Sequence, residues 1–175
     1  MYSGNVFFPV RIGMKGERRS RGRRKGEDGK AMAFSDLELL ARLIQCEAGG
    51  EGDTGMAAVA SVVMNRVRTT VGEYGRLDTL SQVVFQPRQF VCAMETVGGE
   101  YNPQNLYNMR PEAQHYAIAE WAIAGGRVGG LGQALWFFNP YSSKCRPNFP
   151  SGVGTYAMRI GDHCFYDPTS AYEDT

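Results

Sequence analysis

The chain has 175 residues, of which 43% are hydrophobic and 21% are charged, and its formal net charge is +1. This length and composition are typical of one domain with a packed core, and they exclude a chain that is disordered throughout. The apolar runs fall well short of the roughly 18 residues that a membrane-spanning helix needs, so we expect no membrane span.

The first 34 residues differ from the rest in charge. Residues 1–35 carry nine Lys and Arg against three Asp and Glu, a net charge of +6, whereas residues 36–175 have a net charge of −5. Dense charge and glycine without periodicity predict a disordered leader over residues 1–34, followed by one domain over residues 35–175. The apolar run at residues 6–10 is too short for a signal peptide and precedes the charges, so we expect release in the cytoplasm. An arm that binds an anionic polymer is the alternative for this leader.

A helix is predicted from Ser35 to about residue 51. The segment from Ser35 to Glu38 has the capping-box pattern, in which Ser35 caps the helix and Glu38 reaches back to it. Spacings of three and four residues predict one helical face that ends in two glutamates: Leu37, Leu40, Ile44, Glu47 and Glu51. Glycines at 49, 50 and 52 are expected to end the helix near its second glutamate.

A second helix is predicted directly afterwards, with Asp53 or Thr54 as its N-cap. Its apolar stripe comprises Met56, Val59, Ala60, Val63 and Val67. A short helix is predicted after Asp78 and Thr79, stopping at Gln86-Pro87.

The remaining elements alternate between loops, one helix and strands. Residues 86–109 are predicted to form a long loop rich in aromatic and amide side chains, and Pro111 is expected at the first position of a third long helix that ends at Gly125. Segments 133–140 and 155–166 are aromatic or alternating and predict paired strands. The order predicts an α+β fold, with helices first and a small antiparallel sheet near the C-terminus.

The four cysteines lie at wide spacings without a CxxC pair: Cys46, Cys92, Cys145 and Cys164. This spacing disfavours a zinc site, and no metal is predicted. One disulfide, such as Cys145–Cys164, is compatible with the sequence, which does not fix the pairing; we expect free or half-buried thiols.

Glu47 is the strongest catalytic candidate in the residue pattern itself. An ionised carboxylate on an apolar helical face is costly to bury, and desolvation raises its pKa. A carboxylic acid that stays protonated near neutral pH is what general-acid cleavage of a glycosidic bond needs. Glu51, one helical turn on, would raise at least one of the two pKa values further. The alternative is that both side chains point into water at a frayed helix end.

A cysteine nucleophile is a rival interpretation, with His163 as the base and Cys46 or Cys92 as the thiol. His163 and Cys164 cannot form that pair with each other, because neighbours on a strand face opposite sides. Asn65, near the end of the second helix, is expected to hydrogen-bond Glu47 or a loop carbonyl group.

Four blocks of sequence together resemble one enzyme family: ARLIQCEAGGEGDTGMAAVASVVMNRV, TLSQVVFQPRQF, ALWFFNP and IGDHCFY. In this order and spacing, over about residues 36–167, they resemble the SleB/CwlJ cell wall hydrolases, the spore cortex-lytic enzymes of endospore-forming bacteria. Cys145, the pair His163-Cys164 and the missing signal peptide resemble the CwlJ-like branch. The resemblance implies a peptidoglycan-cleaving domain with a lysozyme-like or resuscitation-factor-like α+β fold.

The resemblance also implies roles for individual residues. The family's catalytic glutamate, in the motif E-A-x-G-E, falls on Glu47, and Glu51 would shape the site beside it. Further substrate-binding positions implied by the family's motifs are Asn65, Gln86, Phe90, Asn139, Pro140, His163 and Phe165. Trp136, Phe137 and Tyr141 would add aromatic surface for sugar stacking, with core packing as the alternative for them.

The implied reaction is cleavage between N-acetylmuramic acid and N-acetylglucosamine during spore germination. Attack by the sugar's own 6-hydroxyl group gives an anhydro product, and this lytic transglycosylation is the favoured route. Hydrolysis by water, which ordinarily needs a second carboxylate, is the alternative. A cysteine amidase or peptidase acting on the peptide stems, and a non-enzymatic coat protein that binds polyanions through the leader, are the rival functions.

The expected partner is peptidoglycan, the glycan of the spore cortex. Because the sequence lacks a recognisable peptidoglycan-binding repeat, a coat partner protein or the leader itself would dock the enzyme to its substrate. No nucleic-acid partner and no cofactor are expected, and calcium responsiveness does not follow from the sequence. The implied location is the spore coat or cortex, with the cytoplasm as the alternative.

Overall fold

The computed structural model describes residues 34–175, so the leader predicted over residues 1–34 lies outside the described residues except for Phe34. Phe34 packs against the domain, with its ring centroid 5.6 Å from that of Tyr107 and 4.4 Å from the guanidinium carbon of Arg42. Phe34, the last residue of the predicted leader, therefore contacts the domain.

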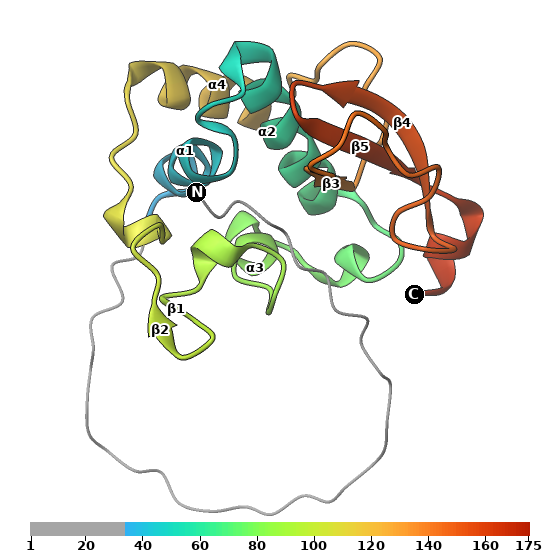
Figure 1. The fold of residues 1–175 in the computed structure, drawn as a ribbon, viewed down its shortest axis with the longest axis horizontal. Coiled ribbons are helices and arrows are strands. Elements are labelled where there is room, and N and C mark those ends of the chain that lie inside the picture. Colours follow the sequence, from blue (N-terminus) through green and yellow to red (C-terminus); the bar gives the residue numbers. More distant parts are fainter. Residues whose placement is uncertain (1–33) are drawn as a thin grey trace, which may run out of the picture.

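Helices gather on one side of the domain, and a three-stranded sheet lies beside them (Figure 1). Helices α1 (Asp36–Ala48), α2 (Gly52–Arg68) and α4 (Ala113–Ile123) pack against one another. Helix α3 (Leu80–Val84) packs against α1 and α2, and α2 contacts the sheet. The predicted α+β class is confirmed. Within residues 34–175, no helix has the length and apolar character needed to cross a bilayer.

Helix α1 begins as predicted but with half of the predicted capping box. Ser35 Oγ accepts a hydrogen bond of 3.2 Å from the backbone N of Glu38. The Glu38 carboxylate does not reach back; it binds Arg42, whose Nε and Nη2 donate at 2.9 and 2.7 Å. Arg42 in turn donates to the carbonyl groups of Leu106 and Met109, at 2.9 and 2.7 Å, and so ties the later loop to α1. The predicted apolar face is correct from Leu40 to Glu47. Leu37 is 38% exposed, and Glu51 lies beyond the end of α1 as the N-cap residue of α2.

Helix α2 starts earlier than predicted. Glu51 is its N-cap residue and makes no side-chain capping bond, so the capping predicted for Asp53 or Thr54 is wrong. The cause is Gly52, whose positive φ of 69° lets the chain turn into the new helix within three residues of α1. Most of the predicted stripe is buried, and Val67 is half-buried.

The elements between α2 and the sheet agree with the sequence in part. Thr79 and Gln82 form a complete capping box at the start of α3. The loop predicted over residues 86–109 also contains a hairpin, β1 (Thr96–Val97) with β2 (Glu100–Tyr101), and short 3-10 helices at Val91–Ala93 and Leu106–Asn108. Glu112 is the N-cap of α4, so Pro111 precedes the helix and is not at its first position.

The sheet has the antiparallel order β3–β5–β4, formed by β3 (Trp136–Phe138), β4 (Gly154–Ile160) and β5 (His163–Pro168). The segment 155–166, predicted as one strand, is a hairpin that turns at Gly161 and Asp162. Gly161 has a φ of 57°, the conformation that such a turn requires. The pairing predicted between 133–140 and the later segment is confirmed for β3 and β5, with Phe137 opposite Phe165.

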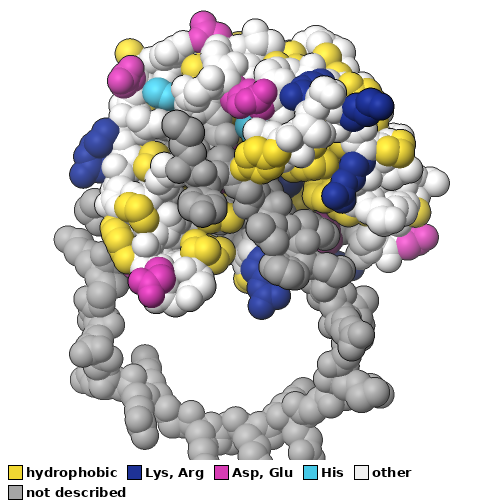
Figure 2. Space-filling model, viewed as in Figure 1, with side chains coloured by type: hydrophobic (Ala, Val, Ile, Leu, Met, Phe, Trp, Pro, Cys, Tyr) yellow, Lys and Arg dark blue, Asp and Glu magenta, His cyan; other side chains and the backbone are white. Residues whose placement is uncertain are grey.

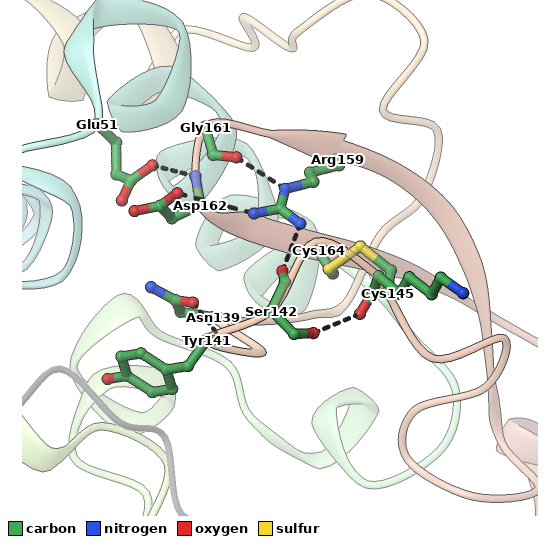
Figure 3. Close-up of a disulfide and its surroundings, with 10 residues drawn as sticks. Glu51, Asn139, Tyr141, Ser142, Cys145, Arg159, Gly161, Asp162 and Cys164 are labelled. Atoms are coloured by element: carbon green, nitrogen blue, oxygen red, sulfur yellow. Dashed lines mark hydrogen bonds and ion pairs between the residues drawn. A yellow bond between two sulfur atoms is a disulfide. The ribbon is translucent and has the colours of Figure 1, made fainter.

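A disulfide bond joins Cys145 to Cys164, so the expectation of free thiols is wrong for these two residues. It attaches the loop after β3 to strand β5 (Figure 3). Cys46 and Cys92 are free, as expected.

Candidate active site

Glu47 lies in the last turn of α1, with its side chain turned into the protein. The residue is 9% exposed, although it carries a carboxyl group. Apolar residues on both sides of it along the helix, Ile44 and Ala48, are buried in the main core. The helical spacing that predicted an inward-facing glutamate is therefore confirmed.

The surroundings of Glu47 favour its protonated form. Burial raises the pKa of the Glu47 carboxyl group, because the ionised form loses its water. A hydrogen bond of 3.1 Å from Cys92 Sγ to Glu47 Oε1 and the positive charge of Arg66 oppose this shift, and the effect of burial prevails. A buried carboxyl group with a raised pKa is able to donate a proton near neutral pH.

Glu51 binds the β4–β5 turn. Its Oε2 accepts a hydrogen bond of 2.7 Å from the backbone N of Asp162, as Figure 3 shows. A Cβ atom at Gly161 would collide with the same carboxylate oxygen, so a glycine is needed there for the close approach as well as for the turn. Glu51 thus joins the α1–α2 junction to the sheet, and the substrate contact predicted for it stays a prediction.

His163 lies beside Glu51 at the start of β5 and is 5% exposed. Its Nδ1 is 3.7 Å from Glu51 Oε1, and its ring meets the edge of Phe137 with centroids 5.3 Å apart. Burial lowers the pKa of the His163 imidazole, and the charges of Glu51 and Asp162 oppose that shift. The histidine predicted from the family motif is therefore a neighbour of the second glutamate of the motif.

Asn65 and Arg66 connect α2 to the segment that enters β3. Asn65 Nδ2 donates to the carbonyl group of Ala134 at 3.0 Å, which confirms the predicted bond to a loop carbonyl. Arg66 Nε donates to the carbonyl group of Leu135 at 2.7 Å. The same guanidinium group lies over the rings of Tyr74 and Phe90, with its carbon 4.7 and 5.2 Å from their centroids. A buried, fixed cation thus contributes to the field at Glu47.

Several of the predicted substrate-binding side chains are buried. Phe90 and Phe165 are 1% and 0% exposed and pack on Phe137. Trp136 is 2% exposed and packs edge-on against Tyr172 in a second aromatic cluster. The Gln86 side-chain oxygen is also buried, with no hydrogen-bond partner among the described residues. In this structure these residues support the site from within the core, and direct contact with a substrate stays a prediction.

Asn139 and Tyr141 form an exposed turn after β3. Asn139 Oδ1 accepts a hydrogen bond of 2.7 Å from the backbone N of Tyr141, whose φ is 51°. Arg159 donates to the carbonyl group of Ser142 at 2.8 Å, and the nearby disulfide also fixes this loop. Tyr141 is 71% exposed, and Figure 3 shows its ring pointing away from the sheet. The sheet side of the molecule shows hydrophobic side chains next to Lys and Arg side chains (Figure 2).

The cysteine-nucleophile interpretation loses support from this geometry. Cys164 is bonded to Cys145, and the Cys92 thiol donates its hydrogen bond to a carboxyl group. Burial raises the pKa of the Cys92 thiol well above its ordinary value, which disfavours the thiolate that a nucleophile requires. Within residues 34–175, no three His, Cys, Asp or Glu side chains are arranged to hold a metal ion.

Two groups that act on Glu47 do not follow from the sequence. The sequence predicts Cys92 only as a candidate nucleophile or a free thiol, and it predicts no role for Arg66. The proximity of Arg66 to Asn65 in the N-R-V block is the one signal that pointed to it; nothing in the sequence pairs Cys92 with Glu47, 45 residues earlier.

A family model described as Cell Wall Hydrolase matches residues 50–166, a range that begins just after Glu47. The chain is 32% identical to the cell wall hydrolase CwlJ of Halalkalibacterium halodurans over 140 residues, covering 78% of this chain and 87% of that protein. It is 33% identical over 106 residues to the spore cortex-lytic enzyme of Oceanobacillus iheyensis, covering 61% of this chain and 33% of that enzyme.

The fold is also similar to a solved structure, the catalytic domain of the germination-specific lytic transglycosylase SleB from Bacillus anthracis. The TM-score is 0.54 at 26% identity, and the likeness covers 79% of this chain and 98% of that domain. The family match, the relatives and the similar solved structure agree with one another. The chain belongs to the cell wall hydrolase family.

Proposed function

We propose that this protein cleaves the glycan strands of spore-cortex peptidoglycan during germination, at the bond between N-acetylmuramic acid and N-acetylglucosamine. The observation that carries the proposal is that Glu47 is a buried carboxyl group whose pKa is raised by desolvation. The resemblance in sequence implies that Glu47 is the family's catalytic glutamate. The names of the relatives, a spore cortex-lytic enzyme and a germination-specific lytic transglycosylase, support this choice of substrate and reaction.

In the proposed mechanism Glu47 acts first as the acid and then as the base. Its proton passes to the oxygen that links the two sugars, and the bond from that oxygen to C1 of the muramic acid breaks. The 6-hydroxyl oxygen of the same muramic acid then bonds to C1, and its proton returns to the Glu47 carboxylate. The product carries a 1,6-anhydro end, no water is consumed, and the enzyme is regenerated.

The position of Glu51 favours this single-carboxyl route over hydrolysis. A hydrolytic glycosidase ordinarily needs a second carboxyl group to activate water or to attack the sugar. Glu51 is the sequence neighbour that offers one, but its carboxylate already accepts the Asp162 amide at 2.7 Å and faces the β4–β5 turn. Transglycosylation needs no such partner, because the substrate supplies its own nucleophile.

Mass spectrometry of the digestion products tests the proposal. Purified cortex peptidoglycan is digested in water enriched in ¹⁸O, and the muropeptides are analysed without chemical reduction. The proposal predicts anhydro-muramic ends without ¹⁸O. Reducing ends that contain ¹⁸O would establish hydrolysis instead, and intact glycan with released peptides would establish an amidase or peptidase.

A thiol alkylator does not separate the glycan-cleaving function from the cysteine-dependent one. Cys92 touches Glu47, so a bulky adduct on its sulfur would obstruct the carboxyl group under either mechanism. The substitution Cys92→Ser is the better discriminator, because it removes the sulfur nucleophile and keeps a small hydrogen-bond donor. Glycan cleavage predicts an active variant, and cysteine catalysis predicts an inactive one.

The proposal places the activity at the spore cortex. Docking to the cortex is proposed for the leader or for a coat partner protein, and the leader lies outside the described residues except for Phe34. The rival function as a polyanion-binding coat protein depends on the same residues.

A further inference from the structure

Cys92 contacts the Glu47 carboxyl group from the loop that follows α3. The thiol lies 3.1 Å from Glu47 Oε1, and the backbone amide of Cys92 acts on the same carboxyl group. Cys92 is 2% exposed, so the contact is made away from bulk water. A hydrogen bond in such surroundings constrains the orientation of both partners more than it would at the surface.

The loop that carries Cys92 is braced from both sides. Phe90, just before it, is buried in the main core, and its carbonyl group accepts a hydrogen bond of 3.1 Å from the N of Ala93. Asn102 Nδ2 donates to the carbonyl groups of Val91 and Met94, at 3.1 and 3.0 Å. These bonds hold the backbone on each side of Cys92, so the position of its thiol is set by the loop.

A second thiol, that of Cys46, lies next to Cys92 without competing for Glu47. Cys46 Sγ donates to the carbonyl group of Gln104 at 3.2 Å. The Cys46 and Cys92 side chains also interact with each other. Each thiol has one proton and can donate one hydrogen bond. Cys46 donates to the carbonyl group of Gln104, and Cys92 donates to Glu47.

We infer that Cys92 is a positioning residue that holds the Glu47 carboxyl group and determines which of its oxygens carries the acidic proton. The inference rests on the proposed function of Glu47 as general acid. With Oε1 accepting the thiol hydrogen, Oε2 carries the proton that goes to the glycosidic oxygen. A thiol suits this role because it is a weak donor, which orients the carboxyl group while stabilising its charge less than a hydroxyl or amide would.

The groups that act on the Glu47 charge come from two elements packed against α1. They are Cys92 in the 3-10 helix Val91–Ala93 and Arg66 in α2; Cys46, on α1 itself, acts on Cys92. Of the other elements packed against α1, helix α3 (LSQVV) has no ionisable side chain. Helix α4 carries His115, Tyr116 and Glu120, and the 3-10 helix Leu106–Asn108 carries Tyr107; none of these is among the groups that shift the Glu47 pKa. A change at Cys92 is therefore expected to shift the titration of Glu47, because the thiol donates a hydrogen bond to that carboxyl group.

The test compares Cys92→Ala and Cys92→Ser with the unmodified protein, and Cys46→Ala serves as the matched thiol-removal control. Two quantities are measured: kcat/KM on cortex peptidoglycan across pH, and the Glu47 titration by carboxyl ¹³C NMR. Cys92→Ala removes a donor to the carboxylate, which destabilises the ionised form and raises the Glu47 pKa. The pH at which kcat/KM decreases, as Glu47 loses its proton, should therefore become higher. In addition, kcat should fall about tenfold with KM unchanged, because the carboxyl group is less well oriented.

Cys92→Ser restores a donor to the carboxyl group. In this variant, the Glu47 pKa from NMR and the pH at which kcat/KM decreases should equal or lie below those of the unmodified protein. Cys46→Ala removes a thiol that donates to Gln104, so it should shift the titration of Glu47 and lower kcat by less than Cys92→Ala does. The inference is overturned if Cys92→Ala leaves the titration of Glu47 where it was, or if Ser behaves like Ala. A Glu47→Gln variant measured alongside separates the two claims. If Glu47→Gln is inactive while Glu47 in the Cys92→Ala variant keeps its pKa, the positioning role is wrong and the proposed function stands. An active Glu47→Gln variant contradicts the proposed function itself.

Discussion

The carboxylate of Glu51 accepts a hydrogen bond of 2.7 Å from the backbone N of Asp162. This contact spans 111 positions in the sequence and joins the junction of the first two helices to the turn between the last two strands. Glu47 and Glu51 lie four residues apart, yet one faces the core and the other binds the sheet. In the proposed mechanism, these different surroundings let one motif supply both the acid and a structural support.

Glu51→Ala is expected to lower the free energy of unfolding by about 1–2 kcal/mol, because a charge-assisted hydrogen bond to the turn is lost. Glu51→Gln keeps an acceptor for the Asp162 amide and should lose less. Urea denaturation followed by circular dichroism measures both values. An alanine variant as stable as the unmodified protein would show that the contact does not support the sheet.

Glu47→Gln is expected to stabilise the protein at neutral pH. Burial raises the Glu47 pKa above its value in the unfolded chain, so the folded state binds more protons between those two values. The contribution of Glu47 to the free energy of unfolding is therefore largest below its pKa in the unfolded chain, about 4.3. This contribution declines as the pH rises towards the pKa of Glu47 in the folded protein. Glutamine has no charge to bury. The stability of Glu47→Gln relative to the unmodified protein should therefore rise with pH between the two pKa values and stay constant above them.

Thermal unfolding at a series of pH values checks the direction of this effect. The control is Glu120→Gln, the same change at an exposed residue of α4, which should show no such pH dependence. An advantage for Glu47→Gln that is largest in acid would contradict the burial of a protonated carboxyl group.

Loss of the Cys145–Cys164 disulfide is expected to destabilise the domain by about 3 kcal/mol, the value for a closed loop of similar length. The two residues are 19 positions apart, and the bond fixes the loop that bears Tyr141. Denaturation with and without a reductant measures the difference. Cys145→Ala should make the stability insensitive to the reductant, whereas a reductant effect that persists in this variant would point to another cause.

Tyr141→Ala is expected to raise KM for glycan about fivefold with little change in kcat, because an exposed aromatic ring gives a sugar about 1 kcal/mol of stacking. Tyr141→Phe keeps the ring and should keep the KM. Position 141 has a positive φ, and neither alanine nor phenylalanine relieves the backbone strain there as glycine would. A difference in KM between the two variants therefore reports the loss of the ring. Equal KM values for Ala and Phe would remove Tyr141 from the substrate-binding surface.

Local patterns predicted much of what lies near Glu47. The three- and four-residue spacing from Leu40 to Glu47 correctly identified an inward-facing carboxyl group, because helical periodicity determines which side chains share a face. The same reasoning misplaced Leu37, which is 38% exposed among the described residues, whereas Leu39 in the same turn is buried. The turn at Gly161 was missed because the alternating pattern of residues 155–166 continues across it, although glycine's freedom at positive φ was the available signal.

Long-range contacts were beyond these patterns. The bond from Cys92 to Glu47 depends on a loop that folds back across 45 positions, and its course is set by Asn102 and by the buried Phe90. Likewise, Glu51 meets Asp162 only because the sheet packs beside α2. Residue spacing along the chain does not predict contacts between side chains that are far apart in the sequence. The family resemblance indicated which residues are expected at the site, but not which of them are in contact.

The activity of Glu47→Gln on spore-cortex peptidoglycan tests the central claim most directly. Glutamine is nearly the same size and can still accept the Cys92 hydrogen bond, but its amide group is too weak an acid to protonate a glycosidic oxygen. We predict a folded variant in which the release of muropeptides falls about a thousandfold, the scale of general acid–base catalysis, while Glu120→Gln remains active. Release within tenfold of the unmodified rate would contradict the account.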